Sequence, residues 1–243
     1  MTTRCFRRIL FAAFCGFTLL QVGQGPLPAI GQTGQPAEQQ LKAGARQGKI
    51  DTKQSRVYVS VRKTGRLGHD CAIEGYVKSG HILLGATRDA GEIVFDVSTF
   101  VANTAAARRY VGLGGTIPAG TRQQITANML SPSVLDASRF PKAMFKITSA
   151  KRVGEENDSN SRKYRLDGKF TLHGLTRPLQ VDVEATDEDG AMRLRGDFYL
   201  WQTQFGITPF RRAFGTLGIA DQLTVYGEIL LEDDAQLPSQ LTK

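Results

Sequence analysis

Apolar and polar residues alternate with a period of two along most of the chain between Ser55 and Glu232. In residues 57–61, for example, valine occupies every second position. Successive side chains of a β-strand point to opposite faces, so this spacing predicts strands with one buried face. Further runs of the same kind occupy residues 93–97, 164–170, 179–183, 192–200 and 223–231. We therefore predict an all-β fold.

Turn-forming residues separate these runs at short intervals. They occur at Lys78–Gly80, Asp89–Gly91, Gly154–Ser161 and Asp187–Gly190. Short connections favour antiparallel neighbours, and the absence of strand–helix–strand alternation disfavours a Rossmann-type sheet. About eight strands with one apolar face can hide their edges by closing into a barrel or by stacking as a sandwich. The spacing alone leaves both arrangements open.

One helix is predicted to interrupt the strands, from Thr121 to Leu130. It opens with the T-x-x-Q spacing of a capping box, and Ile125 and Met129 would share a face. The Ser131-Pro132 pair would end it, because the residue before proline avoids helical angles. A second short turn is expected near residues 134–138.

The first residues have the composition of a secretory signal peptide. Arg4, Arg7 and Arg8 precede an apolar run from Ile9 to Leu20, which is shorter than the roughly 20 residues of a membrane span. We expect a signal peptide over residues 1–31 and a periplasmic or secreted protein; an N-terminal membrane anchor is the alternative. Residues 32–52 are polar and rich in Gln and Gly, which indicates a flexible linker, and residues 234–243 are predicted to be a disordered tail.

Charge excludes one class of partner. Removal of residues 1–31 would take three of the 31 basic residues and none of the 23 acids, so the net charge would fall from +8 to +5. The remaining basic residues are dispersed, with doublets at Arg108-Arg109 and Arg211-Arg212. Nucleic-acid binding requires a basic stripe, so we expect none. The doublets would instead flank a cavity mouth and meet an acidic head group or a membrane surface, or they are solvated loop residues.

Histidine and cysteine supply few candidates for catalysis. His69, His81 and His173 lack the local spacing of metal ligands, so no metal site is predicted. Cys71 would be the only cysteine after removal of residues 1–31, which excludes an internal disulfide. An enzyme that used Cys71 as nucleophile would need a base such as His69 or His173 within hydrogen-bond reach. A small, buried thiol is the alternative.

The segment Phe170–Pro178, with the sequence F-T-L-H-G-L-T-R-P, is the most specific motif of the chain. Other distinctive segments are Ser55–Val59 followed by Gly68-His69, Phe95–Phe100, Asn128–Leu130 through Arg139–Pro141, and Asp221 with Leu223–Leu231. Together they resemble the YceI-like family of exported polyisoprenoid-binding proteins over about residues 53–233. Residues 202–207 keep the Phe-Gly-Ile of that family but lack the Arg and Asp that often precede it.

The resemblance implies a lipocalin-like antiparallel β-barrel over residues 53–233, of about eight strands, with a short helical insertion. Its apolar interior would hold a long-chain polyisoprenoid or an isoprenoid quinone, with neither cofactor nor enzymatic activity. The interior residues expected to contact this ligand are Val57, Val59, Val61, Phe95, Phe145, Leu166, Phe170, Val181, Val183, Leu194, Phe198, Phe205, Val225 and Ile229. Polar residues expected at the mouth are His69, His173, Arg211 and Arg212.

Two other functions compete with lipid binding. A barrel with a filled core could recognise a protein partner through its surface, and the cysteine and histidines could form an enzyme site. Peripheral membrane contact and a homodimer are further expectations.

Overall fold

A computed structural model describes residues 46–154, 161–188 and 190–233. The predicted signal peptide, residues 32–45 of the predicted linker and the predicted C-terminal tail lie outside these residues. The elements are, in chain order, β1 (Arg46–Ile50), β2 (Arg56–Thr64), β3 (Cys71–Leu84), β4 (Gly91–Ala102), α2 (Ala105–Tyr110), α3 (Ala119–Leu130), β5 (Lys142–Val153), β6 (Ser161–Leu172), β7 (Leu175–Glu188), β8 (Ala191–Trp201), η1 (Gln202–Phe205), β9 (Arg211–Arg212), η2 (Ala213–Gly215) and β10 (Leu217–Asp233).

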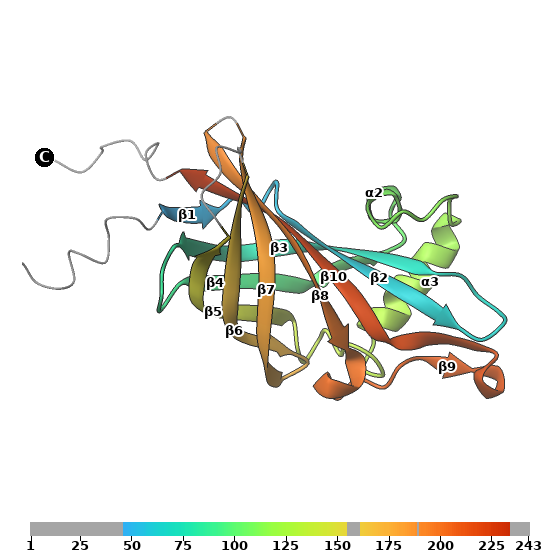
Figure 1. The fold of residues 1–243 in the computed structure, drawn as a ribbon. Coiled ribbons are helices and arrows are strands. Elements are labelled where there is room, and N and C mark those ends of the chain that lie inside the picture. The colour runs from blue at the N-terminus through green and yellow to red at the C-terminus, as the bar shows by residue number, and fades with distance from the viewer. Residues whose placement is uncertain (1–45, 155–160, 189, 234–243) are drawn as a thin grey trace, which may run out of the picture. The chain divides into compact units, whose positions relative to one another are not determined.

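Eight long strands close into an antiparallel barrel (Figure 1). Strands β2 to β8 pair in sequence order, and β10 closes the ring by pairing with both β8 and β2. Closure gives every one of these strands two neighbours. None of them is therefore an edge strand that would expose a row of unpaired backbone groups. The predicted all-β, lipocalin-like barrel is confirmed.

Strand β1 lies in the barrel wall, where a linker was predicted. It pairs with β10 at Gly48–Ile50 and with β3 at Arg46–Lys49. Strand β1 therefore lies between the same two neighbours as β2 and continues the position of β2 toward one end of the barrel. The break between β1 and β2 is a turn in which the Asp51 carboxylate accepts hydrogen bonds from the Lys53 and Gln54 amides. The barrel therefore begins before residue 53, and residues 46–52 are not a flexible linker.

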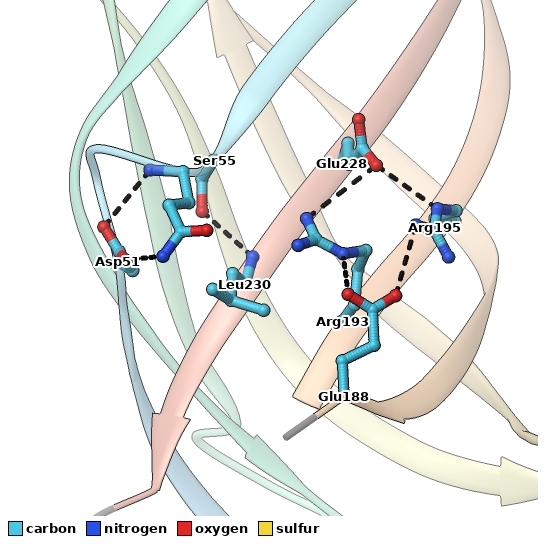
Figure 2. Close-up of polar contacts among 8 residues, drawn as sticks. Asp51, Ser55, Glu188, Arg193, Arg195, Glu228 and Leu230 are labelled. Carbon is cyan, nitrogen blue, oxygen red and sulfur yellow. Dashed lines mark hydrogen bonds and ion pairs between the residues drawn. The ribbon is translucent and has the colours of Figure 1, made fainter. Parts of the chain in front are cut away.

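The buried Ser55 completes this turn. Its side-chain hydroxyl accepts a hydrogen bond from the Leu230 amide at 3.0 Å (Figure 2). The Asp51 amide donates to the Leu230 carbonyl at 2.9 Å. A wall strand that is interrupted leaves backbone groups of its neighbour unpaired. Ser55 supplies the missing acceptor, which explains why a polar residue is fully buried here.

The predicted turn at Lys78–Gly80 is wrong. These residues lie inside β3, which runs unbroken from Cys71 to Leu84 and shifts register against β4 between Val77 and Ser79. A Cβ atom on Gly80 would lie 2.5 Å from the Glu92 carbonyl oxygen. The polar, glycine-containing triplet thus marks a bulge and a close strand approach, two features whose sequence signature overlaps with that of a turn.

The helices lie in the β4–β5 connection. The predicted helical insertion is confirmed as α3. The helix begins at Ala119, with Pro118 as its N-cap residue, and no side chain caps it. The predicted capping box at Thr121 is therefore wrong. Helix α2 was not predicted, although Thr104 caps it by accepting a hydrogen bond from the Ala107 amide at 3.0 Å. None of the helices in the described part of the chain has the length and apolar character needed to cross a membrane.

The two ends of the barrel differ in their connections. We call the end that carries residues 65–70, 103–141, 173–174 and 202–216 the loop end. The opposite end, with β1 and the β3–β4 connection at residues 85–90, is the turn end. Long connections gather at the loop end, which is therefore where a ligand site is expected on a rigid barrel.

Candidate binding cavity

An apolar cavity of about 140 Å³ lies inside the barrel. All of the residues that line it are apolar: Val57, Val59, Ile73, Ile82, Ile93, Phe95, Phe100, Leu135, Ala143, Phe145, Leu166, Phe170, Leu172, Leu179, Val181, Val183, Leu194, Gly196, Phe198, Leu200, Leu223, Val225, Gly227 and Ile229. Such a lining offers a bound molecule apolar surface and no charged or hydrogen-bonding side chain. The cavity suits a hydrocarbon.

The strand alternation aims these side chains inward. On β10, the inward positions are Leu223, Val225, Gly227 and Ile229, every second residue. Gly227 pairs with Gly196 of β8, so two neighbouring wall positions carry no side chain. A Cβ atom on Gly227 would meet only the Gly196 carbonyl oxygen, at 3.9 Å. The open space therefore lies at Gly227, whereas a Cβ atom on Gly196 would lie 2.8 Å from the Asp182 carbonyl oxygen.

Aromatic rings border the cavity toward the loop end. Phe170 contacts Phe198 and Phe205 edge to face, each with ring centroids 5.8 Å apart. Phe205 comes from η1, in the connection after β8, and is buried beneath that segment. Leu135 comes from the β4–β5 connection and is the one lining residue that no strand supplies. Two loop segments therefore contribute side chains to this end of the interior.

Twelve of the fourteen interior residues predicted from the sequence line the cavity. Val61 and Phe205 do not; both are buried in the surrounding core. The prediction missed half of the lining, including Leu172, Leu200 and Leu223, which continue the alternation of strands already identified. Leu135 has no such signal, because its position depends on how the β4–β5 connection folds back on the barrel.

The four polar residues expected at a mouth do not line the cavity. His69 is exposed in the β2–β3 loop, and Arg211 and Arg212 are exposed in β9. His173 is the first residue of the two-residue turn between β6 and β7; its φ of 50° and the φ of 75° at Gly174 are both left-handed. That pattern is typical of a tight hairpin turn, so the L-H-G motif has a structural role here.

The His173 side chain contacts two segments outside the β6–β7 hairpin. Its Nδ1 atom lies 3.2 Å from the Phe205 carbonyl oxygen, and its ring packs edge to face on Phe140 with centroids 4.6 Å apart. Arg177, four residues later, donates from Nε to the Gln204 carbonyl at 3.1 Å. Both contacts hold η1 against the β6–β7 hairpin, which fixes Phe205 under the cavity.

Among the described residues, no hydrogen bond joins the Cys71 thiol to a histidine side chain. The Cys71 thiol is half-buried, and its contact with His69 is a hydrogen bond to the backbone carbonyl oxygen, 3.7 Å away. Burial raises the pKa of the Cys71 thiol, although a hydrogen bond with Asn103 and the charge of Arg108 oppose this. A raised pKa disfavours the thiolate that a nucleophile needs. Within the described ranges, no three His, Cys, Asp or Glu side chains could share a metal ion.

Arg108 explains the polar environment around Cys71. Its buried guanidinium donates to the Gly115 carbonyl from Nε at 3.1 Å, to the Asn103 side-chain oxygen at 3.3 Å and to the Gly114 carbonyl. These bonds fold the glycine-rich loop after α2 back onto the helix. Arg108 is thus a structural residue rather than a surface charge, unlike its neighbour Arg109.

Comparisons with known proteins agree with this architecture. The sequence profile of the YceI-like domain matches residues 49–231. A polyisoprenoid-binding domain from Saccharophagus degradans superposes with a TM-score of 0.52 at 10% identity, covering 78% of this chain and 99% of that one. BcnA of Burkholderia cenocepacia gives 0.47 at 14% identity, covering 74% and 98%. A search of curated protein sequences finds no match. Because the profile spans most of the sequence, the chain belongs to the YceI-like domain family.

Proposed function

We propose that this protein is a lipid carrier that holds the chain of a polyisoprenoid or an isoprenoid quinone inside its barrel, without catalysing a reaction. The observation that carries the proposal is the cavity, whose lining is wholly apolar. The similar domain from Saccharophagus degradans is described as polyisoprenoid-binding, which supports the same ligand class. A barrel with a filled core, as a protein-interaction module would have, does not account for this space.

The size of the cavity sets a condition on the ligand. At about 140 Å³ it resembles a cavity that holds one benzene molecule, so it accepts about one isoprene unit. Burial of five carbons contributes roughly 4 kcal/mol, at about 0.8 kcal/mol per carbon. Association costs an estimated 4–15 kcal/mol, so one unit alone is not retained. Stable binding therefore requires several units, and the interior must widen to receive them.

The loop end provides the parts that can move. Leu135 lies in a run of turns between α3 and β5, attached through backbone hydrogen bonds such as Leu135 N to the Met129 carbonyl at 3.1 Å. Helix α3 itself has no buried residue. Displacement of this segment would uncover the cavity and expose only partly buried apolar side chains (Leu130, Val134, Leu135 and Ala137), whereas the strands of the wall are held by continuous ladders.

The first test is mass spectrometry of an organic extract from the purified protein. We expect an isoprenoid lipid or quinone in roughly stoichiometric amount, either as purified or after incubation with lipid extract. Protein that remains empty under both conditions would contradict the proposal.

A variant that fills the cavity makes the test specific. Gly227→Leu would place a side chain into open space on the barrel wall, so the fold is retained while the volume for ligand is lost. Bound lipid should fall at least about tenfold, with the unfolding midpoint unchanged or raised. Gly227→Ala is the matched control and should keep most of the ligand. Equal lipid content in all three proteins would place the ligand outside the barrel.

We also propose that the protein is exported, on the strength of the basic and then apolar composition of residues 1–31. Expression of the full chain followed by cell fractionation and N-terminal sequencing tests this. The expected mature form begins near Gln32 and lies outside the cytoplasm. A full-length cytoplasmic product would contradict export and leave the cavity unaffected.

A further inference from the structure

A ribbon of backbone extends beyond the closed barrel at the loop end. We call residues 62–70 and 211–219 the basic ribbon. Here β10 still pairs with β2, at Gly218–Thr64 and Ile219–Lys63, and with β9. Its other barrel neighbour, β8, pairs with β10 only from Gln222 onward. The ribbon therefore extends beyond the last pairing of β10 with β8, as Figure 1 shows for β9 and the end of β2.

The two halves of the ribbon form one surface. The Leu67 amide donates a hydrogen bond to the Thr216 carbonyl at 2.9 Å, and Leu67 bridges Leu217. A Cβ atom on Gly65 would lie 2.6 Å from the carbonyl oxygens of Gly215 and Thr216. Such close backbone contact holds the β2–β3 loop and the turn before β10 together.

Two exposed apolar side chains lie on this surface, and one of them belongs to a residue with a strained backbone. Phe214 is fully exposed, and its φ of 54° and ψ of 33° place it in the left-handed region. Leu67, from the other loop, has 58% of its surface exposed. A bulky residue is rarely left-handed, and an exposed phenyl ring gains nothing from water. Strain and exposure at one residue are typical of a position selected for contact with something else.

Positive charge surrounds the two apolar side chains. The ribbon contains Arg62, Lys63, Arg66, Arg211 and Arg212 against a single acid, Asp70, so its net charge is +4. The Asp70 carboxylate accepts a hydrogen bond from the Lys63 backbone amide. In the described part of the chain, none of the four arginines forms an ion pair with an acidic side chain. Their charge is available to an external anion.

We propose that the basic ribbon docks this protein on the surface of an anionic phospholipid bilayer. Phe214 and Leu67 enter the interfacial region, and the arginines contact lipid phosphates. Exposed apolar side chains among basic residues are the composition of interfacial anchors, and a guanidinium binds phosphate through two donors. An acidic protein partner would need a preformed pocket for the exposed phenyl ring, whereas the interfacial region of a bilayer accepts the ring without one. Docking requires no ligand in the cavity, so it does not depend on the proposed lipid-carrier function.

The test is co-sedimentation of the purified protein with phosphatidylcholine vesicles, with and without phosphatidylglycerol. We expect binding to the anionic vesicles, weakened by salt, and little binding to neutral ones. Phe214→Asn removes the ring while keeping a residue that tolerates left-handed angles, and should lower the partition coefficient about tenfold. The double variant Arg211→Glu/Arg212→Glu should reduce binding to background.

Matched controls separate the ribbon from general charge and exposure. Lys146→Glu/Lys169→Glu makes the same change in net charge on exposed, paired positions of β5 and β6, and Tyr199→Asn removes an exposed ring from β8. Both should bind like the wild type. Absence of wild-type binding, equal loss in the controls, equal binding to neutral vesicles, or self-association that depends on Phe214 would each overturn the proposal. Bound lipid, measured in every variant, should stay unchanged and so reports on the cavity separately.

Discussion

The cavity inside the barrel stops short of the residues that pack the extreme turn end, and it continues toward the loop end, where Leu135 lines it. Ile50, Leu84 and Ile147 are at most 2% exposed and do not line the cavity. Phe100, Phe198 and other inward residues toward the loop end are only partly buried, although they point into the same interior. Both regions have apolar residues at alternating positions. The difference shows that the alternation of apolar residues determines which side chains point inward. How closely those side chains pack depends on the elements that close each end of the barrel.

At the turn end, a strand of the barrel wall covers the interior. Strand β1 completes the wall there, and Ile50 at its end pairs with Leu231 of β10. At the loop end, the corresponding space is covered by side chains of two connections, Leu135 and Phe205. Stability and ligand capacity are therefore expected to lie in different parts of one core. The following substitutions test this separation.

The largest effect is expected for Ile147→Ala at the turn end. Loss of a fully buried isoleucine side chain should lower the free energy of unfolding by about 2–5 kcal/mol, because close packing prevents the site from collapsing. Leu179→Ala, at a half-buried position beside the cavity, should cost about 1–2 kcal/mol, since part of its surface already faces empty space. Urea denaturation of both variants measures the comparison. Equal losses would show that the two regions are packed alike.

Ser55→Ala should have the next largest effect. The variant leaves the buried Leu230 amide without its acceptor, so we expect a loss of about 1–3 kcal/mol. Ser133→Ala, at an exposed position in the β4–β5 connection, is the control and should change stability by less than about 0.5 kcal/mol. Similar stability of the two variants would mean that water replaces the Ser55 hydroxyl and that the turn end is less closed than its burial indicates.

A smaller difference is expected between the two glycines of the wall. Gly227→Ala should stabilise the protein by about 0.5 kcal/mol, because the added methyl group enters open space and the unfolded chain loses freedom. Gly196→Ala should destabilise it, since the added Cβ atom would lie 2.8 Å from the Asp182 carbonyl oxygen. Thermal unfolding of both variants gives the sign of each change. A stabilising Gly196→Ala would show that the wall adjusts easily around the cavity.

Local alternation predicted the strands and half of the cavity lining, whereas the choice of a barrel over a sandwich came from the resemblance to the YceI-like family. Val57 and Val59, or Val181 and Val183, need only their neighbours in the chain to be placed on the inner face. Lys78–Gly80 failed because a bulge and a turn use the same residue types, and only pairing with β4 distinguishes them. The prediction missed β1 for a similar reason. Its five residues lack alternation, and they form a strand only because β10 and β3 offer unpaired backbone groups on either side of them.

The candidate site residues at the loop end were harder to predict. Phe205 reaches the core from a 3₁₀ turn, and Leu135 lines the cavity from a connection of nearly forty residues, so neither has a periodic signal. His173 looked like a ligand-orienting residue, whereas its left-handed backbone and its contact with Phe205 make it part of a hairpin turn. Side chains of His are accepted in such turns without any chemical role.

The smallest predicted effect concerns charge on the outside of the turn end. Glu188 lies between Arg193 and Arg195, and Glu228 contacts both arginines (Figure 2). The hydrogen bond from Arg193, at 2.6 Å, is the main cause that lowers the pKa of the Glu188 carboxyl below its ordinary value of 4.5. A carboxyl whose pKa is lower in the folded state stabilises the fold above pH 4.5, and that contribution is lost as the pH falls through the folded pKa.

Glu188→Gln should therefore be less stable than the wild type at neutral pH and equal to it in acid. Unfolding midpoints in urea, measured from pH 7 downward, should converge once the pH is well below 4.5. Glu92→Gln, at a position without an ion pair among the described residues, is the control and should hardly change stability at neutral pH. The side chains of this cluster are partly exposed, so salt should reduce the effect. A gap that persists in acid would mean that Glu188 acts through packing, and that the outer surface of the turn end adds to its stability without help from charge.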